Sequence, residues 1–470
     1  MVTPTYDDLL KENQQLRQQV QQLQEQVRQL KQCLEQAERK SKRQAAPFSK
    51  NTPKANPQKP GRKSGDQHGQ HGHRPPPTEE ADETLEAELP QLCSECGQAV
   101  VETHIDEQYQ TEIPRRPLYR KFRVHCGRCS CCGKSYRGRH PLQTSQATGA
   151  AASQIGPDAQ AAVVYLNKHS GMSHGKISQV FDTLFGISLT PGASAQIVLR
   201  AGQRLQPAYK EIQEHICQSE HVTPDETGWR IGGYPVWLHG WVGDDGATCY
   251  VIDPQRSADA LERVIGLDWS GSMTHDGAST YDRFQESSHQ QCVDHVLRRA
   301  KSLVKKQPSR AKVFPTQVVS LFHEALAVRD QVKAGELDEE AGYQTHDEYT
   351  ARLLDLADRG YVNEENRKLA NHLYNYGEQW FSFLIDVNRP ATNHRAEQAL
   401  KTPIVNRKVW GGNRTPAGGK AQEATSSVLQ TCKTRAIDTV NFISKALRGV
   451  VESLFANTSS QAAGAGASER

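Results

Sequence analysis

The residues that decide the fold are His221–Val242, with the sequence HVTPDETGWRIGGYPVWLHGWV. Asp225 and Glu226 lie between an apolar lead-in and a run that alternates like a strand. Burying an unpaired carboxylate near the start of a strand costs free energy. The two acids therefore predict a metal site, a catalytic proton or a salt bridge at this point of the chain.

The residues that follow predict a mixed α/β domain. HVTPDETGWRIG, YPVWLHGWVGD and ATCYVIDP are short runs separated by Gly and Asp turns, as in an antiparallel meander. Ser257–Ile265 is predicted to be a helix, GSMTHDGAST a fourth strand ending at Asp276, and SSHQQCVDH a fifth strand. This order is that of a ribonuclease H-like fold, in which the first and fourth strands lie adjacent. Asp225 and Asp276 are then expected to meet.

Length and composition indicate a multidomain protein. A chain of 470 residues is too long for one core, and residues before about Leu92 are almost entirely polar. The net charge of +3 hides two basic blocks, Lys40–Lys63 and Arg395–Arg435, which suit nucleic acid, although either is also compatible with a solvated face. No apolar run has the length of a membrane span, and Met1–Leu10 lacks the hydrophobic region of a signal peptide. A cytoplasmic protein, associated with the nucleoid when bound to DNA, is expected.

The amino-terminal segment has a heptad pattern. Leucine recurs every seven residues, at Leu9, Leu16, Leu23 and Leu30. Val20, Val27 and Leu34 occupy a-type positions and Asn13 takes the first of them, which is typical of a parallel two-stranded coiled coil. We therefore expect a homodimer through residues 5–38, with a lone Gln-rich helix as the alternative. Residues 39–90 are predicted to be a disordered linker, basic and then acidic.

Six of the eleven cysteines are concentrated between Cys93 and Cys132, in a chain without a secretion signal, which favours metal over disulfides. Two CxxC turns, each followed by Gly, can present four thiolates tetrahedrally to zinc. The choice of the second cysteine pair is ambiguous because Cys126 and Cys131 lie close to Cys129 and Cys132 in the sequence. We prefer Cys129 and Cys132, since RCSCCG repeats the CxxCG form of the first turn. A redox dithiol would need only one pair. Residues 91–140 are thus predicted to hold a structural Zn²⁺ through Cys93, Cys96, Cys129 and Cys132.

Two further regions are helical in pattern. Residues 145–215 contain SHGKISQVFDTLFG and, after a Gly-containing turn, a second helix capped by Thr190 and beginning at Pro191. This permits a helix-turn-helix with Arg200 and Arg204 on its second helix, and a helical packing domain is equally compatible. Residues 301–385 are predicted to be a charged helical insertion, residues 426–455 a carboxy-terminal helical region and residues 456–470 a disordered tail.

Seven motifs resemble those of bacterial insertion-sequence transposases of the "sixty-six" family. They are RGRHPLQTS, LNKHSGMSHGKI, PDETGWRIGG, THDGASTYDRF, HQQCVDHVLRR, NHRAEQALK and NRKVWGGNRT. Because they are spread from the cysteine-rich region to the carboxy-terminal helix, the resemblance covers most of the chain. The resemblance implies an Asp-Asp-Glu catalytic core in which Asp225, Asp276 and Glu397 form the triad. Three carboxylates suit two Mg²⁺ (or Mn²⁺) ions about 4 Å apart, which activate a nucleophile and stabilise the leaving oxygen in phosphoryl transfer. Glu226, Asp268 and Asp282 are nearby carboxylates, of which Glu226 is a candidate to support the triad.

Basic residues around these acids are predicted to contact DNA phosphates. With the two arginines of the helix-turn-helix they are Arg200, Arg204, Arg298, Arg299, Arg395, Lys401, Arg407, Lys408 and Arg414. The core is expected to occupy residues 218–300 and 386–425, the latter with the glutamate helix and a basic segment.

The sequence thus predicts a DNA transposase that cleaves strands at element ends and transfers them into target DNA. Its expected partners are both DNAs, a second copy of the chain and accessory proteins encoded by the same element. The alternatives are a catalytically inactive, transposase-derived DNA-binding regulator and a ribonuclease H-like nuclease that does not join strands.

Overall fold

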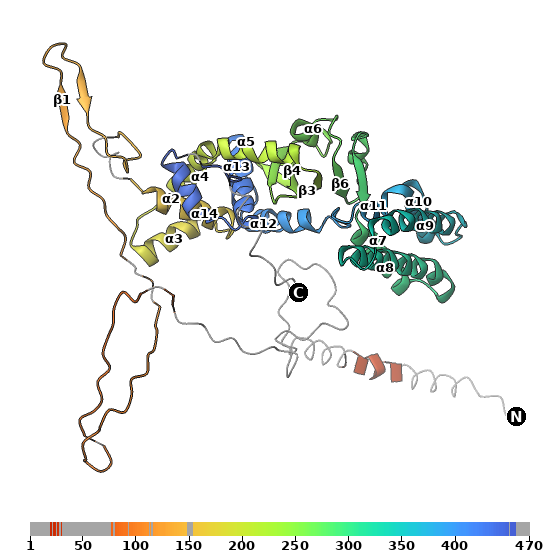
Figure 1. Ribbon diagram of the computed structural model, residues 1–470, viewed down its shortest axis with the longest axis horizontal. Coiled ribbons are helices and arrows are strands. Elements are labelled where there is room, and N and C mark those ends of the chain that lie inside the picture. Colours follow the sequence, from red (N-terminus) through yellow and green to blue (C-terminus); the bar gives the residue numbers. More distant parts are fainter. Residues whose placement is uncertain are drawn as a thin grey trace, which may run out of the picture. The chain divides into compact units, whose positions relative to one another are not determined.

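The computed structural model describes residues 77–78, 80–92, 94–111, 113, 116–147, 154–450 and 452–456, together with residues 19–20, 22–24, 26–27 and 30 (Figure 1). The chain divides into two units, Met1–Glu112 and Ile113–Arg470.

The first unit contains little regular structure among its described residues. Those between 19 and 30 are helical, and Val20, Leu23, Val27 and Leu30 are exposed on them. The rest of the predicted coiled coil at 5–38, and most of the predicted linker at 39–90, lie outside the described residues. Further along, a single β-bridge joins Leu92 to Ala99 around the first CxxC turn.

The centre of the second unit is a five-stranded mixed sheet. The strands are β3 (His221–Ile231), β4 (Tyr234–Gly243), β5 (Thr248–Asp253), β6 (Ser272–His275) and β7 (Ser288–Gln291). Their order is β5-β4-β3-β6-β7, with β4 antiparallel to both β3 and β5, β6 parallel to β3, and β7 parallel to β6. The mixed α/β class and the adjacency of the first and fourth strands of this domain, both predicted from the sequence, are confirmed. A separate hairpin, β1 (Cys126–Arg128) with β2 (Ser135–Arg137), precedes the sheet.

Helices that come before, between and after the strands of the sheet in the sequence share one hydrophobic core. They are α2 (Pro157–Lys168), α3 (His174–Phe185), α4 (Pro191–Arg204), α5 (Gln206–Gln218), α6 (Asp259–Ile265), α13 (Pro416–Thr434) and α14 (Thr439–Leu447). As predicted, α4 starts with Thr190 as its cap, whose hydroxyl accepts from Ala193 N at 3.1 Å, and with Pro191 in the first turn. The core runs from Ala161 to Phe455. Close packing of α4 on α13 requires Gly202, where a Cβ would lie 2.6 Å from Ala421 Cα.

A second core is formed by the helices between β7 and α12. They are α7 (Val293–Lys306), η4 (Ser309–Lys312), α8 (Val313–Lys333), α9 (Glu339–Asp358), α10 (Glu364–Asn375), η5 (Gly377–Gln379) and α11 (Ser382–Ile385), which gather together in Figure 1. Its buried residues extend from Val293 to Ala391. The long helix α12 (His394–Trp410) then packs on the sheet through a third cluster that includes Trp229 and Leu400.

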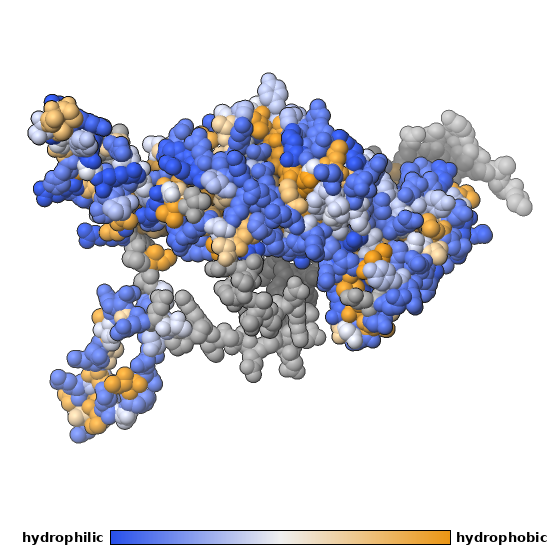
Figure 2. All heavy atoms as spheres, turned by 45° about the horizontal axis from the view of Figure 1, so that its top comes forward, coloured by the Kyte–Doolittle hydropathy of each residue, from blue (hydrophilic) through white to orange (hydrophobic). Residues whose placement is uncertain are grey.

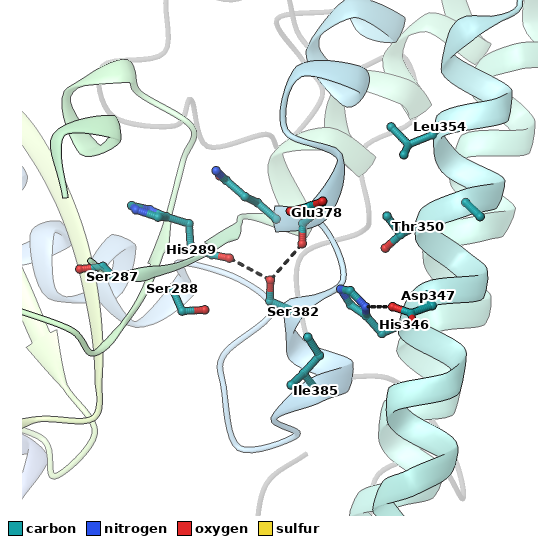
Figure 3. Close-up of a pocket in the computed structure, with 12 residues that line it drawn as sticks. Ser287, Ser288, His289, His346, Asp347, Thr350, Leu354, Glu378, Ser382 and Ile385 are labelled. Carbon is teal, nitrogen blue, oxygen red and sulfur yellow. Dashed lines mark hydrogen bonds and ion pairs between the residues drawn. The ribbon is translucent and has the colours of Figure 1, made fainter. Parts of the chain in front are cut away.

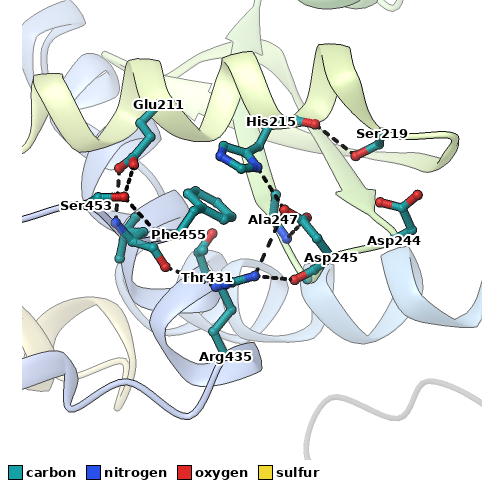
Figure 4. Close-up of polar contacts among 12 residues, drawn as sticks. Glu211, His215, Ser219, Asp244, Asp245, Ala247, Thr431, Arg435, Ser453 and Phe455 are labelled. Atoms are coloured by element: carbon teal, nitrogen blue, oxygen red, sulfur yellow. Dashed lines mark hydrogen bonds and ion pairs between the residues drawn. The ribbon is translucent and has the colours of Figure 1, made fainter. Parts of the chain in front are cut away.

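The last described residues are clamped to α5 (Figure 4). Leu454 N donates to Glu211 at 3.1 Å, and the Phe455 ring stacks on His215 with centroids 3.5 Å apart. Arg435 lies over the other face of this ring at 4.5 Å and donates to the carbonyl of Asp245. These contacts join the carboxy-terminal segment to the first core.

Hydrophilic residues dominate the face of the molecule drawn in Figure 2, with hydrophobic residues in small patches. Within the described part of the chain, each helix is too short or too polar to cross a membrane.

Candidate active site

Two of the predicted catalytic acids lie on neighbouring parallel strands. In the β3–β6 ladder, Val222 is opposite Met273, and Asp225 and Asp276 each follow three residues later. Asp225 is inside β3, whereas Asp276 comes directly after β6. Because residues of parallel strands advance together, the register brings the two carboxylates to the same level of the sheet.

The third predicted acid, Glu397, is in the first turn of α12. Its carboxylate lies 3.4 Å from Arg298 and 3.8 Å from His295, both on α7. Helix α12 rests against β3 through the apolar cluster that contains Trp229, on the same side of the strand as Asp225 because the two residues are four apart.

Electrostatics connect these acids. Burial raises the pKa of Asp225 to about 7, and the charges of Glu226, Asp276 and Glu397 add to the increase. The negative charges of Asp276 and Glu397, the other two members of the predicted triad, therefore both act on Asp225. A divalent cation would stabilise the ionised form of a carboxyl group whose pKa is raised in this way by burial and like charges.

The acids provide hard oxygen donors, which is the chemistry that Mg²⁺ and Mn²⁺ prefer. Nevertheless, among the residues that the structure describes, no three His, Cys, Asp or Glu side chains converge closely enough to hold one metal ion. The donor type thus fits a divalent metal, while the carboxylates do not form a closed ligand set.

Glu226 points to the opposite side of β3 from Asp225. It accepts hydrogen bonds from Arg256 Nε at 2.7 Å and from the Tyr281 hydroxyl at 2.7 Å. Tyr281 belongs to η3 (Ser279–Arg283), just after Asp276, and burial together with Glu226 raises its pKa. Glu226 consequently fastens the segment that carries Asp276 to the strand that carries Asp225.

A histidine pair, of which His275 is fully buried, also fixes this segment, and sequence reasoning missed it. Gly277 N donates to His275 Nδ1 at 3.1 Å, and His275 Nε2 lies 3.0 Å from His289 Nδ1. His289 Nε2 in turn lies 2.9 Å from the carbonyl of Phe284. Each ring therefore accepts at Nδ1 and donates from Nε2, and burial lowers the pKa of His275 to about 3, which keeps it neutral. Both histidines are in the quoted THDG and HQQC motifs, but no sequence periodicity indicates that they touch.

The predicted DNA-contacting residues fall into separate groups. Arg395, Lys401 and Lys408 are exposed on α12, and Arg414 is exposed just beyond it. Arg298 and Arg299 lie on α7, where Arg298 contacts Glu397. Two residues have other neighbours: Arg407 donates to the carbonyl of Gly228 and so joins α12 to β3, and Arg200 lines a cavity of about 520 Å³ between α4 and α13. Arg204 is exposed at the end of α4.

A cavity of about 540 Å³ lies elsewhere, between the edge strand β7 and helices α9 and α11 (Figure 3). Ser382 on α11 donates to the carbonyl of His289 at 2.9 Å across it, and His346 pairs with Asp347 on α9. Its lining includes none of the three predicted acids. The cavity is therefore separate from the candidate active site.

The predicted zinc ligands lie in both units. Cys93 is outside the described residues, and Cys96 precedes Gly97, which has φ +72°. Cys129 and Cys132 share the tight turn of the β1–β2 hairpin, where Cys129 N donates to Lys134 O and Gly133 has φ +69°. Backbone N–H groups of Cys132 and Cys131 lower the pKa of Cys129, which favours the thiolate that a metal requires.

A family model described as Transposase IS66 family matches residues 152–421, more than half of the chain. The matched region runs from α2 into α13 and contains Asp225, Asp276 and Glu397. The comparison with curated protein sequences found no match.

Proposed function

Because the chain belongs to the Transposase IS66 family, we propose that it is the DNA transposase of an insertion sequence. Its proposed activity is divalent-metal-dependent cleavage of strands at element ends, followed by strand transfer into target DNA. The observation that carries the proposal is the parallel register of β3 and β6, which brings Asp225 and Asp276 to the same level, together with the packing on β3 of α12, the helix that carries Glu397. Acids that are distant in sequence are thereby grouped in one site.

The strand order supports a ribonuclease H-like core. Three antiparallel strands are followed by two parallel ones, with the fourth beside the first, so that Asp225 in β3 and Asp276 directly after β6 belong to neighbouring segments. Glu397 comes from a helix that follows the helical insertion, and its carboxylate lies 3.4 Å from Arg298 and 3.8 Å from His295. Glu226, His275 and His289 hold the segment around Asp276 in place.

The proposed chemistry needs no covalent link to the protein. In cleavage, a water oxygen bonds to phosphorus and the bond from phosphorus to the 3′ oxygen breaks, which leaves a 3′-hydroxyl and a 5′-phosphate. In transfer, this 3′-hydroxyl attacks a target phosphate, the target's own 3′ oxygen leaves, and the proton passes to solvent. Asp225, Asp276 and Glu397 would hold the divalent ions, which supply the activation of the nucleophile and the stabilisation of the leaving oxygen. The exposed basic residues of α12 would bind the phosphates of the bound strands.

A structural Zn²⁺ held by Cys93, Cys96, Cys129 and Cys132 is part of the proposal. Its support is that both CxxC turns end in a glycine with positive φ, so the two turns share a local geometry. Dimerisation through residues 5–38 is likewise proposed, on the heptad pattern.

The experiment that tests the function is a mobility assay. A marked element with its natural flanks is supplied with wild-type protein, with Asp225→Asn, or with Asp268→Asn as a matched control on an exposed acid outside the triad. We expect the wild type and the control to move the element, and Asp225→Asn to bind its ends without moving it. If Asp225→Asn moves the element as well as the wild type does, the proposed site is wrong. If the wild type binds ends and moves nothing even with companion proteins, a DNA-binding regulator is the better description.

A further inference from the structure

The tip of the β3–β4 hairpin presents an aromatic ring to solvent. Gly232 and Gly233 both have positive φ, +60° and +86°, as a two-residue type I′ turn requires. Tyr234 follows this turn and is 77% exposed. The ring is therefore accessible to a ligand at the end of the hairpin.

The tip is held rigidly by the segment after α12. Gly232 N donates to Asn413 O at 2.8 Å, and Asn413 N donates to Arg230 O at 2.9 Å. The Asn413 side chain accepts from the indole of Trp229 at 2.8 Å. Backbone and side chain of Asn413 together hold the β3 side of the turn.

The tip has a fixed relation to the candidate active site, because β3 and α12 run side by side in the same direction. Glu397, near the start of α12, lies in the electrostatic neighbourhood of Asp225, whereas Trp410 at its end contacts Trp229 with ring centroids 5.9 Å apart. From Glu397 to Trp410 the helix advances about 20 Å. Tyr234, which lies beyond Trp229 at the tip of the hairpin, is therefore held toward the opposite end of α12 from Glu397.

The path between these points is basic. Lys401 and Lys408 are exposed on the face of α12 that carries Glu397, because they follow it by four and eleven residues. At the tip, Arg230 and Arg414 are exposed, and a Cβ at Gly232 would lie 3.5 Å from the carbonyl of Arg414. Such a row of cations fits the phosphates of one nucleic-acid strand.

We propose that Tyr234 stacks on an unpaired base of the DNA strand bound at Asp225, Asp276 and Glu397, while Arg230 and Arg414 bind the phosphates beside that base. The inference rests on the proposed function and adds a specific contact to it. A base within a duplex has both faces covered by its neighbours, so a ring at a rigid tip finds a free face only where the strand is unpaired. The positive charge around the ring favours DNA over an apolar protein partner.

The test is binding of the full-length protein to three labelled probes, measured by fluorescence anisotropy. The probes are oligo(dT), an oligomer of the same length with abasic sites in place of its bases, and a duplex of mixed sequence. Four proteins are compared, namely the wild type, Tyr234→Ala, Tyr234→Phe and Tyr374→Ala, the last removing another exposed tyrosine on α10. Circular dichroism verifies that each variant is folded.

We expect Tyr234→Ala to weaken oligo(dT) binding about fivefold or more, because one stacked base is lost. Its affinity for the abasic oligomer and for the duplex should equal that of the wild type. Tyr234→Phe should keep the affinity for oligo(dT), since its ring still stacks, and Tyr374→Ala should behave as the wild type.

Three results would overturn the inference: wild-type affinity of Tyr234→Ala for oligo(dT), an equal loss on the abasic oligomer, or an equal loss on the duplex, which would place the ring in a groove. If the wild type moves the element while one of these results is obtained, only the stacking contact is refuted. If the wild type binds none of the probes and moves nothing, the proposed function fails together with it.

Discussion

At the scale of single residues, Lys168 is the least expected side chain. It is 5% exposed at the end of α2, where its ammonium donates to Gln422 Oε1 at 2.6 Å and lies 4.9 Å from the centre of the Trp410 ring. Burial lowers its pKa to about 7. Between this value and the ordinary lysine pKa near 10.5, the unfolded chain binds a proton that the folded chain does not. The contribution of Lys168 to stability should therefore become more favourable as pH rises from about 7 to about 10.

Lys168→Met retains the length of the chain and removes the charge. We expect the variant to exceed the wild type in free energy of unfolding at pH 7, and the difference to shrink as pH rises toward 10. Urea denaturation at several pH values measures this difference, and Lys176→Met on the exposed face of α3 is the control, with little effect at any pH. A difference for Lys168→Met that is constant from pH 7 to 10 would contradict the lowered pKa.

At the scale of elements, the contact between the end of α12 and the β3–β4 hairpin depends on one glycine. Gly412 has φ +106°, and a Cβ there would lie 2.5 Å from the carbonyl oxygen of Arg230. Gly411 also has positive φ, +82°, but a Cβ there would meet nothing within 4 Å. Gly411→Ala should therefore cost about 1 kcal/mol from backbone strain alone, and Gly412→Ala clearly more, because the carbonyl must also move. Equal decreases in the free energy of unfolding for the two variants, measured by urea denaturation, would show that the Arg230 carbonyl moves aside at no energetic cost.

Local signals made part of this architecture predictable. Thr190 and Pro191 define the start of α4 through hydrogen bonding and a fixed φ, which are properties of those residues themselves. The succession of strands predicted that β3 and β6 are neighbours, and hence that Asp225 and Asp276 are close to each other. By contrast, the docking of Asn413 on the hairpin, the pairing of His275 with His289 and the packing of α4 on α13 depend on tertiary contacts. No periodicity or turn residue encodes such contacts between segments that are distant in sequence.

At the scale of the whole molecule, the described part of the second unit contains two large hydrophobic cores that are formed by different elements. One joins α2, α4 and α5 to α13, α14 and Phe455, and the other lies within α7–α11. Because few apolar residues are common to both, each should open as its own cooperative unit in native-state hydrogen exchange. Phe455→Ala removes the ring between His215 and Arg435, and Phe322→Ala removes a fully buried ring from the other core.

Each substitution should cost about 3 kcal/mol within its own core. Phe455→Ala is then expected to raise amide exchange in α5 and α13 while α8 and α10 keep their wild-type protection, and Phe322→Ala is expected to do the reverse. Hydrogen exchange followed by mass spectrometry resolves both regions in one experiment, and each variant serves as the control for the other. If either variant accelerates exchange equally in both regions, the insertion and the rest of the second unit unfold as one cooperative body. In that case, loss of the contacts between Phe455 and α5 would also affect Arg298 and His295 on α7, which contact Glu397.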